Sequence, residues 1–347
     1  MSSHAASDDA RRRPPGMTDV ARLAGVSQKT VSRVVNNERY VSEEAREKVL
    51  RAAAELGFRP NTAARALITG RFKRIGVVSL GSALYGPASM LVALERATRA
   101  AGLSFMVANT PEGQPEAIQD AVDWLLAQGV DGILLSEPKD EGQHLRPAGV
   151  PIVSLGQAAD LPEAQVALSR GRTAASCREA VEHLLDLGHA RVWHVAGPQD
   201  WWEGRERLEG WAEAHRARGI EPPPPLQGDW TPAGGYAAGR VLPPEATAVF
   251  CANDDTAIGL SRALSEAGRR VPEDVSLVGF DDIPAAAYLT PPLTTVQQDF
   301  EGDATHALDV LMRLLPGAAP PEPEAKAAPP RRRLVIRSST APPLSHR

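Results

Sequence analysis

Four polar side chains share one face of a short predicted helix: Gln28, Lys29, Ser32 and Arg33. At about 100° per residue they cover an arc of roughly 140°, whereas the apolar side chains of Val31 and Val34 face the other way. Arg33 can form a bidentate pair with guanine O6 and N7, Gln28 can pair with adenine N6 and N7, and Lys29 can donate to guanine or phosphate. One face of this helix can therefore pack while the other reads the edges of DNA bases.

Two short helices position this face. Thr18 is a good N-cap for the first helix, whose apolar residues repeat with helical spacing until Gly25 stops it. Ser27 caps the second helix, which we expect to run through about Asn36. Two short helices joined by AGVS, with the second opening on a polar residue, form the helix-turn-helix signature of DNA-binding domains.

A third helix is predicted from its N-cap, Ser42, to Gly57, which ends it. The sequence predicts a buried stripe of four apolar residues along this helix: Val49, Leu50, Ala53 and Leu56. Further on, Asn61 caps the six-residue segment TAARAL, which is too short to be helical alone in water because nucleation costs more than so few hydrogen bonds return. We expect this segment to become helical only when it is docked.

Basic residues are concentrated around these helices. Residues 11–74 hold 15 Lys or Arg against 6 Asp or Glu, although the whole chain of 347 residues carries a formal charge of −5. A basic head on an acidic body indicates a polyanionic partner for the head, and the alternative is a solvated surface without a partner. The first 16 residues lack periodicity and are interpreted as a disordered tail.

Beyond residue 72 strands alternate with amphipathic helices, which is typical of an α/β fold with parallel sheets. A first lobe is predicted to contain strands at 74–80, 104–109, 132–136 and 151–155, with helices at 87–101 and 115–128. A second lobe is predicted to contain helices at 173–188, 204–219, 233–242 and 255–268, with strands at 191–197, 248–253 and 275–282. One more helix at 302–315 and a closing strand at 334–339 complete the pattern.

Polar residues follow three strands of the second lobe, and Arg207, Asn253 and Asp281 are examples. Because ligands of open α/β sheets gather at the carboxyl ends of strands, we expect these groups to converge. Together they offer donors, an amide and an acceptor, which suit the neighbouring hydroxyls of a sugar, and Trp230 can cover the apolar face of the sugar ring. As an alternative, Asp281 and the adjacent Asp282 only close a turn after a strand.

Three segments carry a resemblance to a known family: VARLAGVSQKTVSRVVNN at 20–37, VSEEAREKVLRAAAELGFRPN at 41–61 and AARAL at 63–67. They closely resemble the DNA-binding head of the LacI/GalR family of transcription regulators, and the resemblance continues from about Met17 to Ser339. It implies that two heads bind a pseudopalindromic, double-stranded operator. We expect the following residues at that contact: Thr18, Ser27, Gln28, Lys29, Thr30, Ser32, Arg33, Asn36, Asn61, Ala64 and Leu67. The resemblance places Leu67 in the central base step, where an apolar wedge kinks DNA from the minor groove.

The resemblance also implies a two-lobed core like that of periplasmic binding proteins, with the ligand cleft between lobes that the chain crosses three times. The expected domains are a tail at 1–16, a helix-turn-helix domain at 17–60, a hinge helix and linker at 61–71, an effector-binding and dimerisation core at 72–340 and a tail at 341–347. Within the core, we expect the N-lobe at about 72–168 and 300–328, and the C-lobe at about 169–299 and 329–340.

The same resemblance predicts which residues of the cleft contact the effector. Arg207, Asn253 and Asp281 fall on the polar effector contacts of the family. The stretches GDW at 228–230 and PPLTTVQQDF at 291–300 look most like the lactose-repressor type of this family. They add Trp230, Gln298 and Phe300, and the N-lobe lip adds Tyr85, Ser136 and Glu137 as candidates.

Two positions depart from the family pattern. Gly156 stands where the lactose-repressor type has an effector-contacting aspartate, and Arg172 stands where many members have an aspartate that opens a C-lobe helix. The expected ligand is a sugar, with a β-galactoside as the first candidate. Because of these two departures, the identity of the sugar stays open.

The resulting prediction is a cytoplasmic homodimer that represses carbohydrate-utilisation genes until a sugar inducer releases it. A dimer is expected because no leucine heptad follows LVIRSST. One alternative keeps the fold but uses a purine or phosphoprotein corepressor. Another is a sugar-binding transport component, which the DNA-binding head and the absence of an early signal sequence disfavour.

Enzymatic activity, cofactors and metals are not expected, because no GxGxxG, P-loop or GxSxG motif and no metal-ligand spacing is present. No stretch approaches the roughly 20 apolar residues that span a bilayer, so no membrane partner is expected. Cys177 and Cys251 are interpreted as small buried hydrophobic residues.

Overall fold

The computed structural model describes residues 13–35, 40–59, 70–111, 114, 116–137, 139, 145–156, 172–316 and 332–344. Four residues predicted to contact DNA lie outside these ranges: Asn36, Asn61, Ala64 and Leu67. The chain divides into two compact units, Met1–Phe72 and Lys73–Arg347. None of the described helices is both long and apolar enough to cross a membrane.

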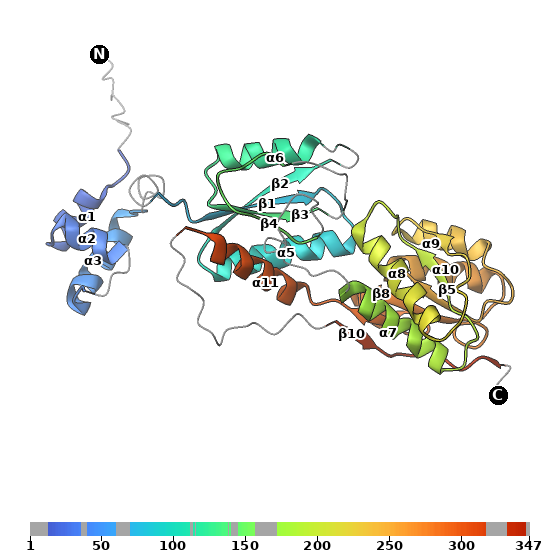
Figure 1. Ribbon diagram of the computed structural model, residues 1–347. Coiled ribbons are helices and arrows are strands. Elements are labelled where there is room, and N and C mark those ends of the chain that lie inside the picture. The colour runs from blue at the N-terminus through green and yellow to red at the C-terminus, as the bar shows by residue number, and fades with distance from the viewer. Residues whose placement is uncertain are drawn as a thin grey trace, which may run out of the picture. The chain divides into compact units, whose positions relative to one another are not determined.

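The first unit contains three described helices around one small core (Figure 1). They are α1 (Met17–Ala24), α2 (Gln28–Val35) and α3 (Glu43–Leu56). The predicted caps of α2 and α3 are confirmed, because the Ser27 hydroxyl accepts the Thr30 N–H at 3.1 Å and the Ser42 hydroxyl accepts the Ala45 N–H at 3.3 Å. The predicted packing face of α2, with Val31 buried at its centre, is also confirmed.

The prediction for the start of α1 is wrong. This helix begins at Met17, with Gly16 rather than Thr18 at its N-cap. The Asp19 carboxylate accepts the Gly16 N–H at 2.9 Å. A side chain of the first turn therefore binds the backbone of the cap residue, whereas in a usual cap the side chain of the cap residue binds the backbone of the first turn. The predicted end at Gly25 is confirmed by its left-handed backbone, with a φ of 66°.

The predicted buried stripe of α3 contains one error. Leu50 is 57% exposed, whereas Ala52 is 4% exposed and belongs to the core. Leu50 lies about 100° around the helix from the buried Val49, while Ala52, three residues further on, shares the face of Val49. The angular position of a residue on α3 therefore predicts its burial better than the size of its side chain does.

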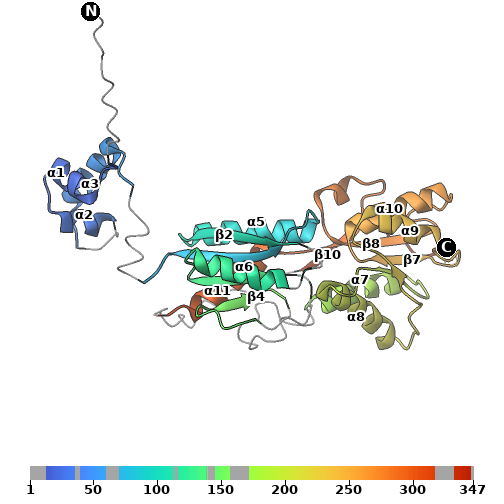
Figure 2. The same ribbon diagram turned by 90° about the horizontal axis from the view of Figure 1, so that it is seen from above.

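The second unit contains two lobes, each with a sheet between helices (Figures 1 and 2). In the N-lobe the strand order is β2–β1–β3–β4, and all neighbours are parallel. The strands are β1 (Arg74–Leu80), β2 (Ser104–Thr110), β3 (Gly132–Ser136) and β4 (Ile152–Ser154). One face carries α6 (Glu116–Ala127), and the other carries α5 (Tyr85–Ala100) and α11 (Phe300–Leu314).

The C-lobe sheet has the order β10–β9–β8–β7–β5–β6. Its strands are β5 (Trp193–Ala196), β6 (Leu226–Gln227), β7 (Ala248–Cys251), β8 (Ser276–Asp281), β9 (Thr294–Gln297) and β10 (Arg333–Val335). Helices α7 (Arg172–Asp186) and α8 (Trp202–Ala217) cover one face, and α9 (Pro232–Arg240) and α10 (Asp254–Glu266) cover the other (Figure 2). The predicted α/β class is confirmed, although β10 pairs antiparallel with β9. The strands β6 and β9 and the 3-10 turn η2 (Pro284–Tyr288) were not predicted.

Helices α9 and α10 approach each other through glycines. A Cβ on Gly259 would lie 1.7 Å from the carbonyl oxygen of Pro232, and one on Gly235 would lie 2.1 Å from that of Thr256. Two helix backbones come this close only where no side chain lies between them. The contact holds the first half of α10 against α9, and α10 begins shortly after the end of β7.

Helix α11 and strand β10 lie late in the sequence but complete different lobes. Four residues of α11 belong to the N-lobe core that also contains Ile75 and Leu94: Ala304, Ala307, Leu308 and Leu311. Strand β10 instead pairs with β9 at the edge of the C-lobe sheet. Elements from the C-terminal part of the chain therefore build both lobes.

Candidate functional site

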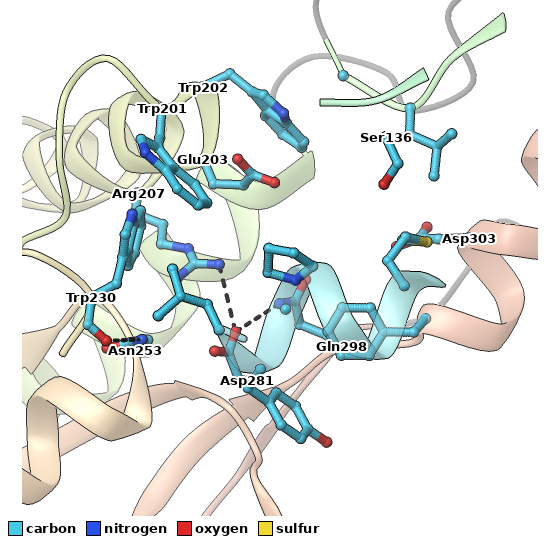
Figure 3. Close-up of a pocket in the computed structure, with 18 of the residues that line it drawn as sticks. Ser136, Trp201, Trp202, Glu203, Arg207, Trp230, Asn253, Asp281, Gln298 and Asp303 are labelled. Carbon is cyan, nitrogen blue, oxygen red and sulfur yellow. Dashed lines mark hydrogen bonds and ion pairs between the residues drawn. The ribbon is translucent and has the colours of Figure 1, made fainter. Parts of the chain in front are cut away.

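A cavity lies between the two lobes of the second unit, at the carboxyl ends of their parallel strands (Figure 3). It encloses about 770 Å³ that protein atoms do not fill, including space open to solvent. Nine core residues singled out from the sequence all line it: Tyr85, Ser136, Glu137, Arg207, Trp230, Asn253, Asp281, Gln298 and Phe300. Gly156, Trp201, Trp202, Glu203, Asp303 and Arg332 line it as well.

Arg207 of α8 lies in the wall of the cavity and is only 5% exposed. Its guanidinium carbon lies 4.1 Å from the centre of the Phe280 ring and 4.9 Å from that of Trp230, so two aromatic faces hold it in place. Nη1 donates to the carbonyl of Ala252, and Nη2 lies 3.5 Å from the Asp281 carboxylate. These contacts fix the planar donor group at one end of the cavity.

Asp281 is the last residue of β8, and its φ of 111° is rare for a residue with a side chain. Its carboxylate accepts the Gln298 side-chain N–H at 2.7 Å (Figure 3). Burial raises the pKa of Asp281 to about 6, although the nearby Arg207 and the hydrogen bond from Gln298 act in the opposite direction. The unusual backbone therefore directs a buried acceptor into the cavity.

Asp282, the next residue, has a different task. Its φ is 55°, and its carboxylate pairs with Arg337 at 2.6 Å and accepts from Gln297 at 2.9 Å. The two adjacent carboxylates are thus separated, with Asp281 at the cavity and Asp282 tied to the segment after β10. Of the two aspartates, Asp282 fits the alternative of a turn residue.

Asp254 holds the same turn from the other side. It is fully buried, and its carboxylate accepts the Ile283 N–H at 2.8 Å and the Thr295 hydroxyl at 2.6 Å. Burial raises the pKa of Asp254 to about 8, and the charge of Asp281 adds to this rise. Asp254 does not line the cavity, so it acts by positioning the residue that does.

Asn253 and Trp230 are joined by a hydrogen bond. The Asn253 side chain donates to the Trp230 carbonyl at 3.0 Å and also accepts the Thr256 N–H at 2.9 Å, which makes it the N-cap of α10. Trp230 has a left-handed backbone, with a φ of 69°, and its ring packs so closely on Gly197 that a Cβ there would lie 2.3 Å away. Trp201 adds a second indole, 5.6 Å from Trp230 between ring centres.

The N-lobe side of the cavity combines an aromatic wall with a charged cluster. The rings of Tyr85 and Phe300 meet edge to face at 5.9 Å. Asp303 of α11 is 1% exposed and lies 3.6 Å from both Arg172 and Arg332. Since α11 belongs to the N-lobe and Arg172 begins α7 of the C-lobe, this arginine makes an ion pair between the lobes.

Gly156, the other departure from the family pattern, also has a structural reason. A Cβ at this position would lie 2.4 Å from the indole Nε1 of Trp202. The Trp202 ring therefore occupies the space into which an aspartate side chain at position 156 would extend. This tryptophan is a cavity residue.

The helix predicted to read DNA has the expected two faces. Val31 is fully buried and Val34 is 5% exposed, whereas Gln28 and Lys29 are exposed. Ser32 and Arg33 are half-buried, and the Thr30 hydroxyl is hydrogen-bonded to Ser27 at 2.9 Å. The exposed face of α2 is free to meet a partner through Gln28 and Lys29, and Thr18 is exposed on α1.

A family model described as "Bacterial regulatory proteins, lacI family" matches residues 16–61, and one described as "Periplasmic binding protein-like domain" matches residues 181–340. The lactose operon repressor of Escherichia coli (strain K12) is 35% identical over 314 residues, which cover 88% of this chain and 86% of that protein. This chain belongs to the LacI family of bacterial regulatory proteins. It is thus a DNA-binding transcriptional regulator, as the resemblance predicted.

Other members of the LacI family show a similar fold. The HTH-type transcriptional regulator CelR of Thermobifida fusca is 40% identical over 304 residues, which cover 84% of this chain and 89% of CelR. The structure of the lac repressor dimer bound to operator and the anti-inducer ONPF matches with a TM-score of 0.78 at 33% identity, over 95% of this chain and all of that one. The CelR–cellobiose complex matches with a TM-score of 0.67 at 34% identity, over 94% and 99% of the two chains.

Proposed function

We propose that this chain is a homodimeric repressor of carbohydrate-utilisation genes that a β-linked sugar, such as a β-galactoside or a β-glucoside, releases from its operator. One observation carries the sugar assignment. Arg207, Asp281 and Gln298 form a connected set of donors and acceptors at one end of the cavity, the first two buried and Gln298 half-buried, with the Trp230 ring beside them. Hydroxyls of one sugar ring match such a set, and an indole face matches the apolar side of the ring.

The names of two relatives support the class of ligand. One is the lactose operon repressor, and the solved complex of another, CelR, contains cellobiose. Lactose and cellobiose are both β-linked sugars. Gly156 and the Trp202 ring that packs on it distinguish the wall of this cavity, so we propose the class and leave the choice between the two sugars to experiment.

The helix-turn-helix domain at 17–60 supplies the proposed contacts to DNA bases. We propose that Gln28, Lys29 and Arg33 of α2 contact base edges in the major groove. Residues 61–71 act as the hinge, with Leu67 as the wedge at the centre of a pseudopalindromic operator. Two heads of a dimer then bind two half-sites.

The coupling follows from linkage. A sugar that binds better to the core in its DNA-free state weakens operator binding, and the operator weakens sugar binding by the same factor. The proposal needs only a difference in sugar affinity between the two states of the core. A corepressor would bind better to the state that holds DNA.

The test begins with an operator selected by the full-length protein from random DNA duplexes. Its affinity is then measured by fluorescence anisotropy with lactose, cellobiose or hypoxanthine at millimolar concentration. We expect at least one disaccharide to weaken operator binding tenfold or more. If only hypoxanthine changes the affinity, and strengthens it, the chain is a purine-responsive repressor and the sugar proposal is wrong.

A further inference from the structure

Glu203 is a cavity residue whose role the proposed function leaves open. It lies in the first turn of α8, and its carboxyl group is directed into the open space between Arg207 and Ser136 (Figure 3). Its Oε2 atom is buried and has no hydrogen-bond partner among the residues that the structure describes. A buried polar atom without a partner is costly, so a group that binds in the cavity can recover that cost.

Other charged groups around Glu203 already have partners. Arg207, on the same helix, pairs with Asp281 at 3.5 Å, and Arg332 pairs with Asp303 at 3.6 Å. On the N-lobe side, Glu137 accepts the Thr110 hydroxyl at 2.6 Å. The two cations of the cavity wall are thus paired with aspartates, although Nε of Arg207 and of Arg332 has no hydrogen-bond partner among the described residues, whereas Glu203 has no ion pair in the described part of the chain.

The polar groups of the cavity form two sets on opposite sides of the open space. Arg207, Asp281 and Gln298 lie on one side, whereas Ser136 and Asp303 lie on the other (Figure 3). Glu203 and the neighbouring Trp202 lie at the edge between the two sets. We infer that a single sugar ring at the first set does not reach Ser136, which lies across the open space (Figure 3).

Resting on the function proposed above, we propose that Glu203 selects a ligand with two linked sugar rings. Its carboxylate accepts hydrogen bonds from hydroxyls of the second ring, which lies toward Ser136, while Arg207 and Asp281 hold the first. An ionised carboxylate is an acceptor only, and two of its lone pairs suit two neighbouring hydroxyls. The chain thereby prefers disaccharides to single-ring glycosides.

The same contact links sugar binding to pH. Burial raises the pKa of the free Glu203 carboxyl to about 7, with Arg207 acting in the opposite direction. Hydroxyl donors favour the ionised form, so binding releases a proton and the disaccharide affinity rises with pH. With a free pKa of about 7, Glu203 alone contributes an increase of about tenfold in affinity between pH 6 and pH 8, in addition to the smaller part that Asp281 contributes.

The experiment is calorimetric titration of full-length protein with cellobiose, lactose, methyl β-glucoside and methyl β-galactoside at pH 6 and pH 8. The variants are Glu203→Gln, which keeps the shape of the side chain, and Glu203→Ala. The control is Glu209→Gln, which removes an exposed carboxylate on the same helix, paired with Arg216. Thermal unfolding of each variant confirms that it is folded.

At pH 8, where Glu203 is ionised, we expect both Glu203 variants to bind the disaccharide about 10- to 100-fold more weakly, which corresponds to the loss of a hydrogen bond to a charged group, and to bind methyl glycosides as the parent does. Glu203→Gln should also flatten the pH dependence to about twofold, the part that Asp281 contributes through its pKa of about 6. Parental disaccharide affinity in both variants would overturn the inference alone. Equal losses for one-ring and two-ring ligands would overturn the selection, and the absence of any sugar binding to the parent would overturn the proposed function as well.

Discussion

Arg207 and Asp281 form a buried ion pair, 3.5 Å between guanidinium nitrogen and carboxylate oxygen, that joins the middle of α8 to the end of β8. Each group is about 5% exposed and keeps its place through further contacts, Arg207 by stacking on two rings and Asp281 through Gln298. Such a pair fixes the direction of its donors and acceptors before a ligand arrives. A preformed pair spends less binding free energy on ordering the site.

Arg207→Lys should abolish most of the sugar response and leave operator binding intact. Lysine keeps the charge beside Asp281 but loses the planar fork of donors and the stacking on Trp230. We expect the sugar concentration for half release of operator to rise by tenfold or more. Anisotropy titrations with the parent as reference measure this, and release at the parental sugar concentration would show that Arg207 does not contact the ligand.

Asp254→Ala should loosen the turn that presents Asp281. The substitution leaves the buried Ile283 N–H and Thr295 hydroxyl without their acceptor, at a cost of roughly 2–4 kcal/mol of stability. Urea unfolding of the parent and the variant gives this difference. A change below about 0.5 kcal/mol would mean that the turn does not depend on Asp254.

Asp254→Asn should change how stability depends on pH. The pKa of Asp254 is about 8 in the folded chain and 3.8 in its unperturbed form, so the folded state binds the extra proton between these values and the parent loses stability as the pH rises through that range. Asparagine removes this proton. The decrease in unfolding free energy between pH 5 and pH 8 should therefore be smaller in the variant, and an equal decrease would contradict the assignment.

Gly156→Ala should weaken ligand binding although the change is a single methyl group. The new Cβ would meet the Trp202 indole at 2.4 Å, so the ring must leave its place in the cavity wall. We expect at least a tenfold loss of sugar affinity by calorimetry. Gly86→Ala is the matched control, because Gly86 also lines the cavity and its Cβ would have nothing within 4 Å.

Gly259→Ala should destabilise the C-lobe by about 1–3 kcal/mol, the usual cost of extra volume in a packed contact. Its methyl group would meet the Pro232 carbonyl at 1.7 Å, so α9 and α10 must separate. Gly86→Ala again serves for comparison and should be neutral or slightly stabilising. Equal unfolding midpoints for the two variants would show that the α9–α10 contact can relax without loss.

Leu67→Ala should weaken operator binding and leave sugar binding unchanged, because the wedge proposed for Leu67 contacts only DNA. Leu50→Ala provides the control, since Leu50 is a leucine of the same unit that is 57% exposed on α3. A gel shift with the selected operator compares the variants with the parent. Equal affinity for Leu67→Ala and Leu50→Ala would rule out the wedge.

Helix starts could be predicted from the sequence where a single side chain forms the cap. Ser27 and Ser42 cap helices because each can accept an N–H three residues later, and that geometry is fixed by the helix. The prediction of Thr18 as an N-cap was wrong because the helix begins after Gly16, whose N–H is bound by the Asp19 carboxylate. The error shows that two overlapping caps of similar strength cannot be ranked from residue types alone.

The cavity was predictable where residues follow strands. Asn253 and Asp281 stand at strand ends, and parallel strands bring such ends together. Glu203 was missed, although it lies four residues before Arg207 and this spacing places both on one helix face. Asp303 and Arg332 had no local signal, because their meeting depends on α11 packing in the N-lobe while Arg332 directly precedes β10 of the C-lobe.

The placement of α11 has a consequence for synthesis on the ribosome. The first unit can fold as soon as residues up to Phe58, which packs on its core, have emerged. The N-lobe has to wait, because Ala304, Leu308 and Leu311 of α11 fill its core. A chain that stops before Phe300 leaves the apolar face beneath α11 uncovered, so truncated products expose the surface that chaperones and proteases recognise as unfolded.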